Sequence, residues 1–186
     1  MTPRPGSVRD DWRSDVLKFW FGLDPQLWWR GPPELDEQVR DRFLGLWEEK
    51  RDLPPESFLA DPLTALAATI LFDQFPRNMF RGHADQFSTD PLALAIAKGA
   101  VGRGLDEALE PKERGFLYMP FQHSEQIDDQ NRSLLLFTAL GDPEQLRYAK
   151  LHHDVIARFA RFPHRNAILG RAPRADEIAA GDVVPW

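Results

Sequence analysis

The stretch D-P-L-T-A-L-A-A-T-I-L-F-D-Q-F-P-R-N, from Asp61 to Asn78, predicts a helix and sets the pattern for the rest of the chain. Its proline suits the first helical turn, because the amide hydrogen that proline lacks would be unpaired there, and Asp61 can cap the free amides. Apolar residues then recur at intervals of three and four, which is the spacing of one helix face. These residues are Leu63, Leu66, Ala67 and Ile70. The same face reaches Asp73, whose carboxylate has to be paired if it is buried.

Acid–proline pairs recur at positions 90–91, 110–111 and 142–143 and predict three more helix starts of this kind. The Gly-rich run at 99–104 predicts a helix end, and Pro120 predicts a kink or a stop, because an interior proline removes a hydrogen bond. With the amphipathic patterns elsewhere, helices are expected over 14–21 and 34–47, from 62 to the first Phe-Pro motif, over 91–99, 111–120 and 124–140, and from 142 to Pro163. No segment alternates as a strand does, so the sequence predicts an all-α fold of about seven helices.

The spacing of the helix starts is close to that of helical-hairpin repeats. Positions 61 and 90 are 29 residues apart and positions 110 and 142 are 32 apart, compared with about 34 residues in tetratricopeptide repeats. We therefore expect a tetratricopeptide-like superhelix, with a compact orthogonal bundle as the alternative. A single domain is expected over residues 12–171, between an N-terminal tail at 1–11 and a C-terminal tail at 172–186.

Composition excludes several classes of function. The 186 residues carry a net charge of -6, which gives no general attraction to nucleic acid or to an anionic membrane. The chain has no cysteine, which excludes thiol catalysis, disulfides and thiolate metal sites. No apolar run approaches the roughly 18 residues of a membrane span, and the first residues lack the apolar segment of a signal peptide. A cytoplasmic protein is the expectation, and its oligomeric state stays open.

Two related motifs place Phe-Pro beside Arg and Asn, although both of these residues are costly to bury. The first is Q-F-P-R-N-M-F-R-G at 74–82, and the second is R-F-P-H-R-N-A-I-L-G-R at 161–171. In one interpretation the proline stops a helix, the Arg and Asn donate to its last carbonyls, and carboxylates of the chain pair with the arginines. In the other, the motifs converge and bind a small anion, because an Arg contact with a carboxylate or phosphate is bidentate and charge-assisted. The ligand-binding residues would then be Asp73, Arg77, Asn78, Arg81, Arg161, His164, Arg165, Asn166 and Arg171.

The stretch Y-M-P-F-Q-H-S-E at 118–125 offers a second kind of chemistry. Ser124 can cap the helix that follows, and Glu125 then lies in its first turn. If His123 and Glu125 instead face a cavity, they form a general acid–base pair. His152, on an apolar stripe, is interpreted as a hydrogen-bonded core histidine. No pair of histidines has the spacing of a metal motif and no dinucleotide or phosphate-loop motif is present, so neither metal nor cofactor is expected.

Taken together, several of these motifs resemble the bacterial family catalogued as domain of unknown function 924. They are F-W-F-G at 19–22, D-Q-F-P-R-N at 73–78, Y-M-P-F-Q-H-S-E at 118–125, D-Q at 129–130 and the second Phe-Pro motif. The resemblance extends from about Asp15 to Arg171. It implies an all-helical, tetratricopeptide-like superhelix with no established activity, substrate or cofactor. It also implies that Asp129, Gln130 and His152 belong with the other polar residues as one site. One departure is Ala160, because the family has glycine at that turn.

Three functions are compatible with these features. The first is the binding of a small anionic molecule by the two Phe-Pro motifs. The second is a metal-independent hydrolase or lyase, with His123 as the base, Glu125 orienting it and the arginines stabilising negative charge. The third is an interaction module whose concave helical surface holds a peptide or helix, with the Trp28-Trp29 pair as an anchor. No partner among nucleic acids or membranes is expected.

Overall fold

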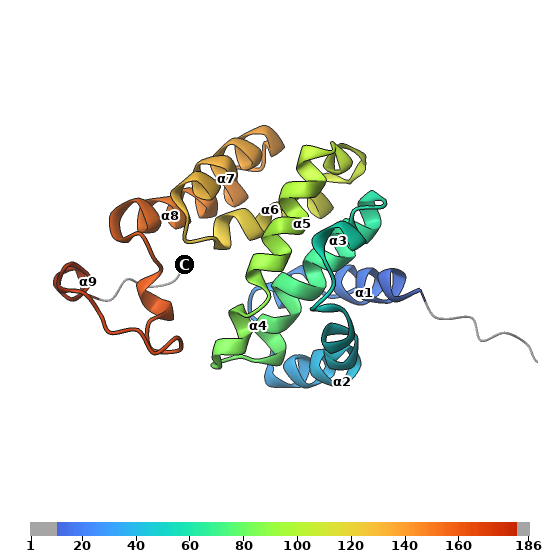
Figure 1. Ribbon diagram of the computed structural model, residues 1–186, viewed down its shortest axis with the longest axis horizontal. Coiled ribbons are helices and arrows are strands. Elements are labelled where there is room, and N and C mark those ends of the chain that lie inside the picture. The colour runs from blue at the N-terminus through green and yellow to red at the C-terminus, as the bar shows by residue number, and fades with distance from the viewer. Residues whose placement is uncertain (1–10, 182–186) are drawn as a thin grey trace, which may run out of the picture.

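The computed structural model describes residues 11–181, and this range contains helices and no strand (Figure 1). The prediction of an all-α fold is confirmed, whereas the superhelical array remains a prediction. The α-helices are α1 (Trp12–Phe21), α2 (Pro33–Lys50), α3 (Pro62–Thr69), α4 (Phe75–Met79), α5 (Asp90–Gly102), α6 (Pro111–His123), α7 (Ile127–Leu140), α8 (Pro143–Phe159) and α9 (Ala175–Ala180). A π-helical segment, η3 (Ile70–Gln74), joins α3 to α4, and short 3-10 turns lie at η1 (Pro25–Trp28), η2 (Pro55–Phe58), η4 (Ala84–Phe87), η5 (Leu105–Ala108) and η6 (Pro163–Arg165).

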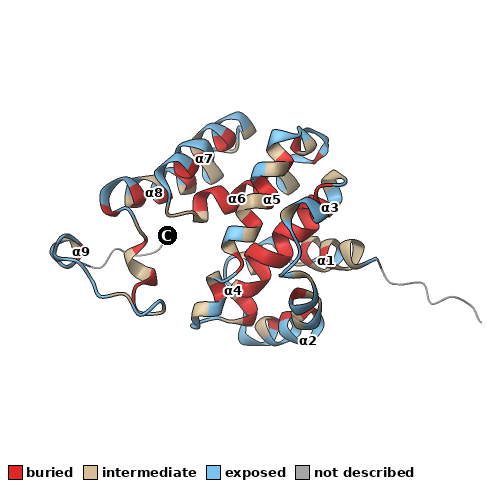
Figure 2. Ribbon diagram, viewed as in Figure 1, coloured by how far each residue is buried: buried red, intermediate tan, exposed pale blue. Residues whose placement is uncertain are grey.

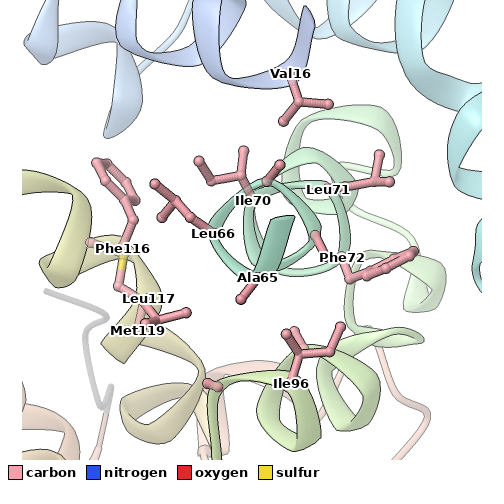
Figure 3. Packing of buried hydrophobic residues seen from close by; sticks show 14 of the residues in the cluster. Val16, Ala65, Leu66, Ile70, Leu71, Phe72, Ile96, Phe116, Leu117 and Met119 are labelled. Atoms are coloured by element: carbon pink, nitrogen blue, oxygen red, sulfur yellow. The ribbon is translucent and has the colours of Figure 1, made fainter. Parts of the chain in front are cut away.

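Helix α3 and segment η3 form the centre of the molecule, as Figure 2 shows. Every residue from Thr64 to Pro76 is buried, so this run is surrounded and not merely amphipathic. Helices α1, α5 and α6 pack around it and contribute Val16, Ile96 and Phe116 to the core (Figure 3). Of the apolar face predicted from the sequence, Leu66, Ala67 and Ile70 are buried, whereas Leu63 in the first turn of α3 is exposed, which corrects the prediction for that residue.

The acid–proline pairs start helices as predicted, with one exception. The carboxylate of Asp61 accepts a hydrogen bond from the amide of Thr64 at 2.9 Å. Asp142 caps α8 in the same way, and Glu110 is the N-cap of α6. Asp90 differs, because it is the first residue of α5 and Thr89 takes the N-cap position. The side chain of Asp90 is thereby available for another contact.

The proline of the first Phe-Pro motif does not stop the helix, which corrects the prediction from the sequence. The chain stays helical through Pro76 to Met79, because η3 widens the turn that the proline ring enters. In an α-helix the missing amide of Pro76 would leave the carbonyl of Phe72 without a donor. The hydroxyl of Thr89 donates to that carbonyl at 2.7 Å and replaces the lost hydrogen bond.

Helix α6 also continues past its proline, Pro120, and ends at His123. Ser124 is the C-cap of α6, and Gln126 is the N-cap of α7, so the capping role expected of Ser124 in the next helix is not observed. Helices α6, α7 and α8 then pack on one another in chain order. No helix within residues 11–181 is long and apolar enough to cross a membrane.

The chain turns sharply after α8. Ala160, the C-cap of this helix, has φ of 56° and ψ of 12°, which is the left-handed conformation that glycine adopts most easily. The following turn η6 carries Arg165 back toward α5. Helix α9 lies in the predicted C-terminal tail at 172–186, of which residues 182–186 are outside the described range. Of the predicted N-terminal tail at 1–11, only Asp11 is described, as the N-cap of α1.

Candidate functional site

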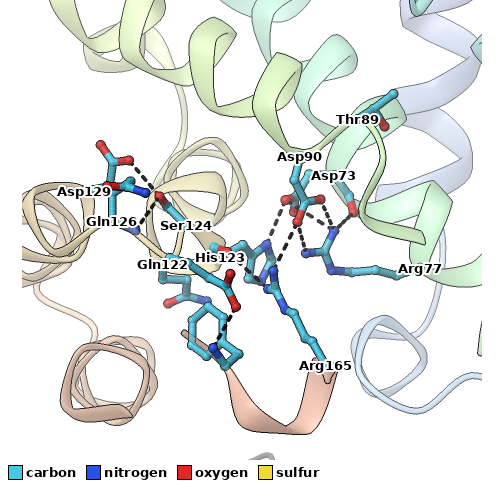
Figure 4. A network of polar contacts seen from close by, with 12 residues as sticks. Asp73, Arg77, Thr89, Asp90, Gln122, His123, Ser124, Gln126, Asp129 and Arg165 are labelled. Atoms are coloured by element: carbon cyan, nitrogen blue, oxygen red, sulfur yellow. Dashed lines mark hydrogen bonds and ion pairs between the residues drawn. The ribbon is translucent and has the colours of Figure 1, made fainter. Parts of the chain in front are cut away.

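Five charged or titratable side chains meet where the two Phe-Pro motifs converge (Figure 4). We call these residues the central cluster. They are Asp73 of η3, Arg77 of α4, Asp90 of α5, His123 of α6 and Arg165 of η6. Because α3, η3 and α4 form one buried helical run, Asp73 and Arg77 are held by the core, and the other three side chains reach them from neighbouring elements.

Asp73 and His123 form a tightly held pair. Oδ1 of Asp73 lies 2.7 Å from Nδ1 of His123, and the carboxylate is fully buried. Burial acts to raise the pKa of Asp73, but the neighbouring His123, which is hydrogen-bonded to the carboxylate, and the guanidinium of Arg77 lower it to about 2. The carboxylate is therefore ionised at neutral pH and accepts the Nδ1 hydrogen of the imidazole.

The imidazole of His123 is neutral when the site is empty. Burial lowers the pKa of His123, while the nearby charge of Asp73 acts in the opposite direction. With the hydrogen on Nδ1 directed to Asp73, the lone pair of the neutral ring is on Nε2. No described residue forms a hydrogen bond with this Nε2. The ring can therefore accept a proton there.

Arg77 and Asp90 form the second pair of the cluster. The guanidinium Nη1 and Nη2 donate to the two carboxylate oxygens of Asp90 at 2.8 and 3.0 Å. Nη1 also lies 2.5 Å from the backbone oxygen of Asp73 and 3.5 Å from its carboxylate. Both terminal nitrogens of Arg77 thus have partners inside the chain.

Arg165 is the least well paired cation of the cluster. Its side chain is 9% exposed, and its Cζ lies 4.4 Å from the ring centre of Phe87 and 4.5 Å from that of Phe162. Nη2 donates to the backbone oxygen of His123 at 3.1 Å, whereas the carboxylate oxygen of Asp90, the nearest among the described residues, is 3.7 Å from Nη1. Nε is buried and has no hydrogen-bond partner among the described residues. Burial and the charge of Arg77 lower the pKa of Arg165 to about 10, so it stays charged at neutral pH.

Two further predicted histidines lie next to the cluster. The ring centre of His152 is 5.9 Å from that of His123, and its Nδ1 lies 2.7 Å from the backbone oxygen of Tyr148. The ring centre of His164 is 5.6 Å from that of Phe162. Burial lowers the pKa of His152 to about 2 and that of His164 to about 4, so both rings are neutral near pH 7.

Glu125 does not orient His123, which corrects the pairing expected from the sequence. Its Oε1 accepts a hydrogen bond from the amide of Phe162 at 2.7 Å, and both its oxygens accept from Arg171, at 2.7 and 3.0 Å. The orienting carboxylate of His123 is Asp73. Glu125 instead holds the segment that carries Arg165.

The remaining predicted residues of the second motif extend this arrangement. Arg171 donates from Nε to Asn166, and Asn166 donates to Glu177 of α9 at 3.0 Å. Arg161 makes a bidentate contact with the same Glu177, at 2.5 and 2.8 Å. Arg161, Asn166 and Arg171 therefore have internal partners and stabilise the chain between α8 and α9.

Four other predicted residues lie outside the central cluster. Asn78 and Arg81 both donate to Asp36 of α2, at distances of 2.6 to 2.8 Å. Asp129 accepts from Ser124 and lies 2.5 Å from the ammonium of Lys98. Gln130 donates to the backbone oxygens of Gln122 and Ser124, where α6 turns into α7. These contacts hold helices together.

Three residues that complete these networks are not predicted from the sequence: Asp90, Phe87 and Glu177. From the sequence, Asp90 is expected to cap a helix because a proline follows it. The available signal was Thr89, a second residue able to cap, which leaves Asp90 for another role. Phe87 and Glu177 lie in short elements with no pattern that links them to the Phe-Pro motifs.

No group of three or more histidines and carboxylates is arranged to hold a metal ion in the part of the chain that the structure describes. The chemistry offered by the central cluster is that of an imidazole oriented by a buried carboxylate, beside a guanidinium with an unused donor. Such a group can hold an oxyanion or exchange a proton with a bound molecule.

Comparisons with known proteins agree with the fold and give no activity. Residues 16–180 match the family described as a bacterial protein of unknown function (DUF924). Among solved structures, the chain is similar to a protein of unknown function from Agrobacterium tumefaciens, with a TM-score of 0.83 and 37% sequence identity. The similarity covers 90% of this chain and 95% of the other. No curated protein matches the chain.

Proposed function

This chain belongs to the bacterial DUF924 family, and we propose that its central cluster binds a small anion, a carboxylate or a phosphate, against Arg165. The observation that carries this proposal is the state of the Arg165 guanidinium. It is charged and buried, its Nε has no partner among the described residues, and its closest carboxylate contact is long, at 3.7 Å.

The physical reason is the cost of an unused donor on a buried cation. Leaving such a donor unpaired costs about 1–3 kcal/mol or more, and an anion placed beside it removes that cost and adds a charge-assisted hydrogen bond. Contacts of the guanidinium with the rings of Phe87 and Phe162 restrict its movement, so little conformational freedom remains to be lost on binding.

The other arginines expected to bind the anion support the proposal less. Arg77, Arg81, Arg161 and Arg171 each make close contacts with a carboxylate of the chain. We therefore assign the binding mainly to Arg165, with His123 of the cluster beside it.

Thermal-shift measurements with phosphate, sulfate and small carboxylates test the proposal. A ligand at 100 times its dissociation constant stabilises the folded state by about 2.7 kcal/mol, which corresponds to a rise in Tm of roughly 5–10 °C for a chain of this size. We expect this rise in wild type, a smaller one in Arg165→Lys, and none in Arg165→Gln.

Arg158→Gln is the matched control, because Arg158 is an exposed arginine near the end of α8. This variant should respond to the anion as wild type does. Equal responses from wild type and Arg165→Gln would contradict the proposal, as would the absence of any response to every anion tested.

The Asp73–His123 pair favours a second role, that of a metal-independent hydrolase or lyase. A carboxylate that holds Nδ1 sets the tautomer in which Nε2 can take a proton, and general-base catalysis of this kind contributes about 10²–10⁴-fold. Activity found in a screen of esters and lyase substrates should fall by at least about 100-fold in His123→Ala. Full activity in that variant would exclude His123 as the base.

A further inference from the structure

We propose that His123 binds the anion together with Arg165 and does so as an imidazolium, so that each bound anion brings one proton into the site. This inference rests on the proposed function and assigns the ligand a class, an oxyanion with two acceptor oxygens. One oxygen would accept from Arg165 and the other from Nε2 of His123.

The hydrogen-bond pattern of His123 requires the extra proton. Asp73 takes the hydrogen on Nδ1, at 2.7 Å, so the neutral ring presents a lone pair at Nε2. A lone pair repels an oxyanion, which is itself only an acceptor. Once Nε2 carries a proton, the ring donates on both sides, to Asp73 and to the ligand.

The charge of the central cluster leads to the same requirement. With His123 neutral, the carboxylates of Asp73 and Asp90 balance the guanidinium groups of Arg77 and Arg165. A bound anion adds a negative charge that this mostly buried cluster does not compensate, and uncompensated buried charge is costly. One proton on His123 compensates one unit of that charge.

The neighbouring groups leave His123 as the acceptor of this proton. The charged and titratable groups near it are Asp73 of η3, Arg77 of α4, Asp90 of α5, His152 of α8 and Arg165 of η6, with His164 near His152 and Glu125 two residues further along the chain. The pKa of Asp73 is lowered to about 2, and those of His152 and His164 to about 2 and 4, so these groups take up no proton near neutral pH. Glu125 is held ionised by Arg171.

The coupling between proton uptake by His123 and anion binding predicts how the affinity changes with pH. Burial lowers the pKa of His123 in the empty protein, and the anion raises it in the complex. Between these two pKa values the empty site has to gain a proton in order to bind, so the dissociation constant increases as pH rises, by up to about tenfold per pH unit.

Isothermal titration calorimetry of the wild-type protein with sulfate, at pH 6, 7 and 8, tests this inference. Sulfate keeps its charge over this range, so any pH dependence arises in the protein. Titrations at pH 7.5 in Tris and in imidazole, two cationic buffers with different ionisation enthalpies, give the number of protons taken up. We expect about one proton per sulfate and weaker binding at each higher pH.

His123→Gln provides the decisive comparison, because its amide nitrogen can donate to the ligand without titrating. This variant should bind sulfate with no proton uptake and with a dissociation constant that does not change from pH 6 to 8. His83→Gln, which changes an exposed histidine, should behave as wild type.

Nitrogen NMR of the histidine side chains in wild type adds a readout that needs no variant. The Nε2 signal of His123 should move to the shift of a protonated imidazole when sulfate is added. Sulfate binding without proton uptake, or with an unchanged His123 signal, would overturn the role of His123 alone. Failure of sulfate to bind at any pH, or equal binding by Arg165→Gln, would instead contradict the proposed function itself.

Discussion

Asp73 is fully buried, and its charge is held by the imidazole of His123 and the guanidinium of Arg77. Replacement by Asn leaves both partners without this carboxylate while the side chain keeps nearly the same volume. Breaking a buried pair by removing one partner costs about 3–5 kcal/mol. Asp73→Asn is therefore expected to lower the free energy of unfolding, measured with urea at pH 7, by about 3 kcal/mol.

The matched control is Asp154→Asn, because Asp154 is exposed on α8. Its free energy of unfolding should stay within about 0.5 kcal/mol of wild type. Equal stability of the two variants would show that the buried carboxylate contributes nothing to folding.

Buried neutral histidines give the protein a specific pH dependence. The pKa values of His152 and His164 are lowered in the folded chain, to about 2 and 4, below the ordinary value of about 6.5. Below pH 6.5 the unfolded chain binds protons at these two histidines, whereas the folded chain does not. The free energy of unfolding therefore falls as pH decreases. Each such ring contributes at most about 1.4 kcal/mol per pH unit.

Urea unfolding at pH 7.5, 6.5 and 5.5 measures this effect. The free energy of unfolding should decrease below pH 6.5 in wild type and decrease less in His152→Asn, whose amide can still donate to Tyr148. His83→Asn should keep the slope of wild type. Constant stability between pH 6.5 and 5.5 would contradict the burial of these rings in neutral form.

Ala160 is the one non-glycine residue with positive φ between residues 11 and 181. A side chain in this conformation costs roughly 1–2 kcal/mol, and glycine avoids the cost. Ala160→Gly is expected to raise the free energy of unfolding by about 1 kcal/mol, or roughly 2–4 °C in Tm. Ala157→Gly, at an exposed position inside α8, should lower stability by about 1 kcal/mol. Destabilisation by both changes would contradict the backbone conformation at Ala160.

At the scale of elements, the helical run from Pro62 to Met79 depends on Thr89. The Thr89 hydroxyl donates to the carbonyl that Pro76 leaves unpaired, and accepts from the indole of Trp47 at 3.1 Å. Thr89→Val keeps the shape but removes both hydrogen bonds. Because both former partners are buried, the change should cost about 1–3 kcal/mol in urea unfolding.

Thr138→Val is the control for this substitution. Thr138 is exposed on α7, and its hydroxyl donates only to a carbonyl of its own helix, at 2.6 Å. A cost within about 0.5 kcal/mol is expected there. If Thr89→Val were equally harmless, the carbonyl of Phe72 would need another donor.

The elements that could be predicted from the sequence are those set by local chemistry. Asp61 and Asp142 cap helices because the free amides and the carboxylate lie within three residues of each other. The behaviour of the chain at Pro76 could not be predicted, because the compensating donor, Thr89, lies in another element. Sequence patterns detect a missing hydrogen bond but not a distant replacement.

The candidate site likewise has features that could be predicted from the sequence and features that could not. The polar nature of the Phe-Pro motifs and of His123 could be predicted, because arginine and histidine beside apolar residues demand partners. The partner that each of these residues contacts could not be predicted. Glu125 is two residues from His123, yet α6 ends between them and directs Glu125 toward Arg171, while the carboxylate that meets His123 arrives from η3.

At the scale of the whole molecule, the site exists because two motifs 88 positions apart, at Arg77 and Arg165, are brought to the same carboxylate. The first is fixed in the buried centre. The second is delivered by the segment after α8, which Glu125 and Glu177 hold through Arg171 and Arg161. Convergence of one rigid and one ion-paired segment places the guanidinium of Arg165 against the backbone of His123, whose imidazole is held by Asp73.

The most direct measurement is a crystal structure of the protein grown with selenate, whose selenium is located by its anomalous signal. We expect one ordered selenate in the central cluster, with oxygens about 2.7–3.2 Å from a guanidinium nitrogen of Arg165 and from Nε2 of His123. Arg165 joined to Asp90 alone, with selenate absent from the cluster at a concentration that saturates surface sites, would contradict this expectation.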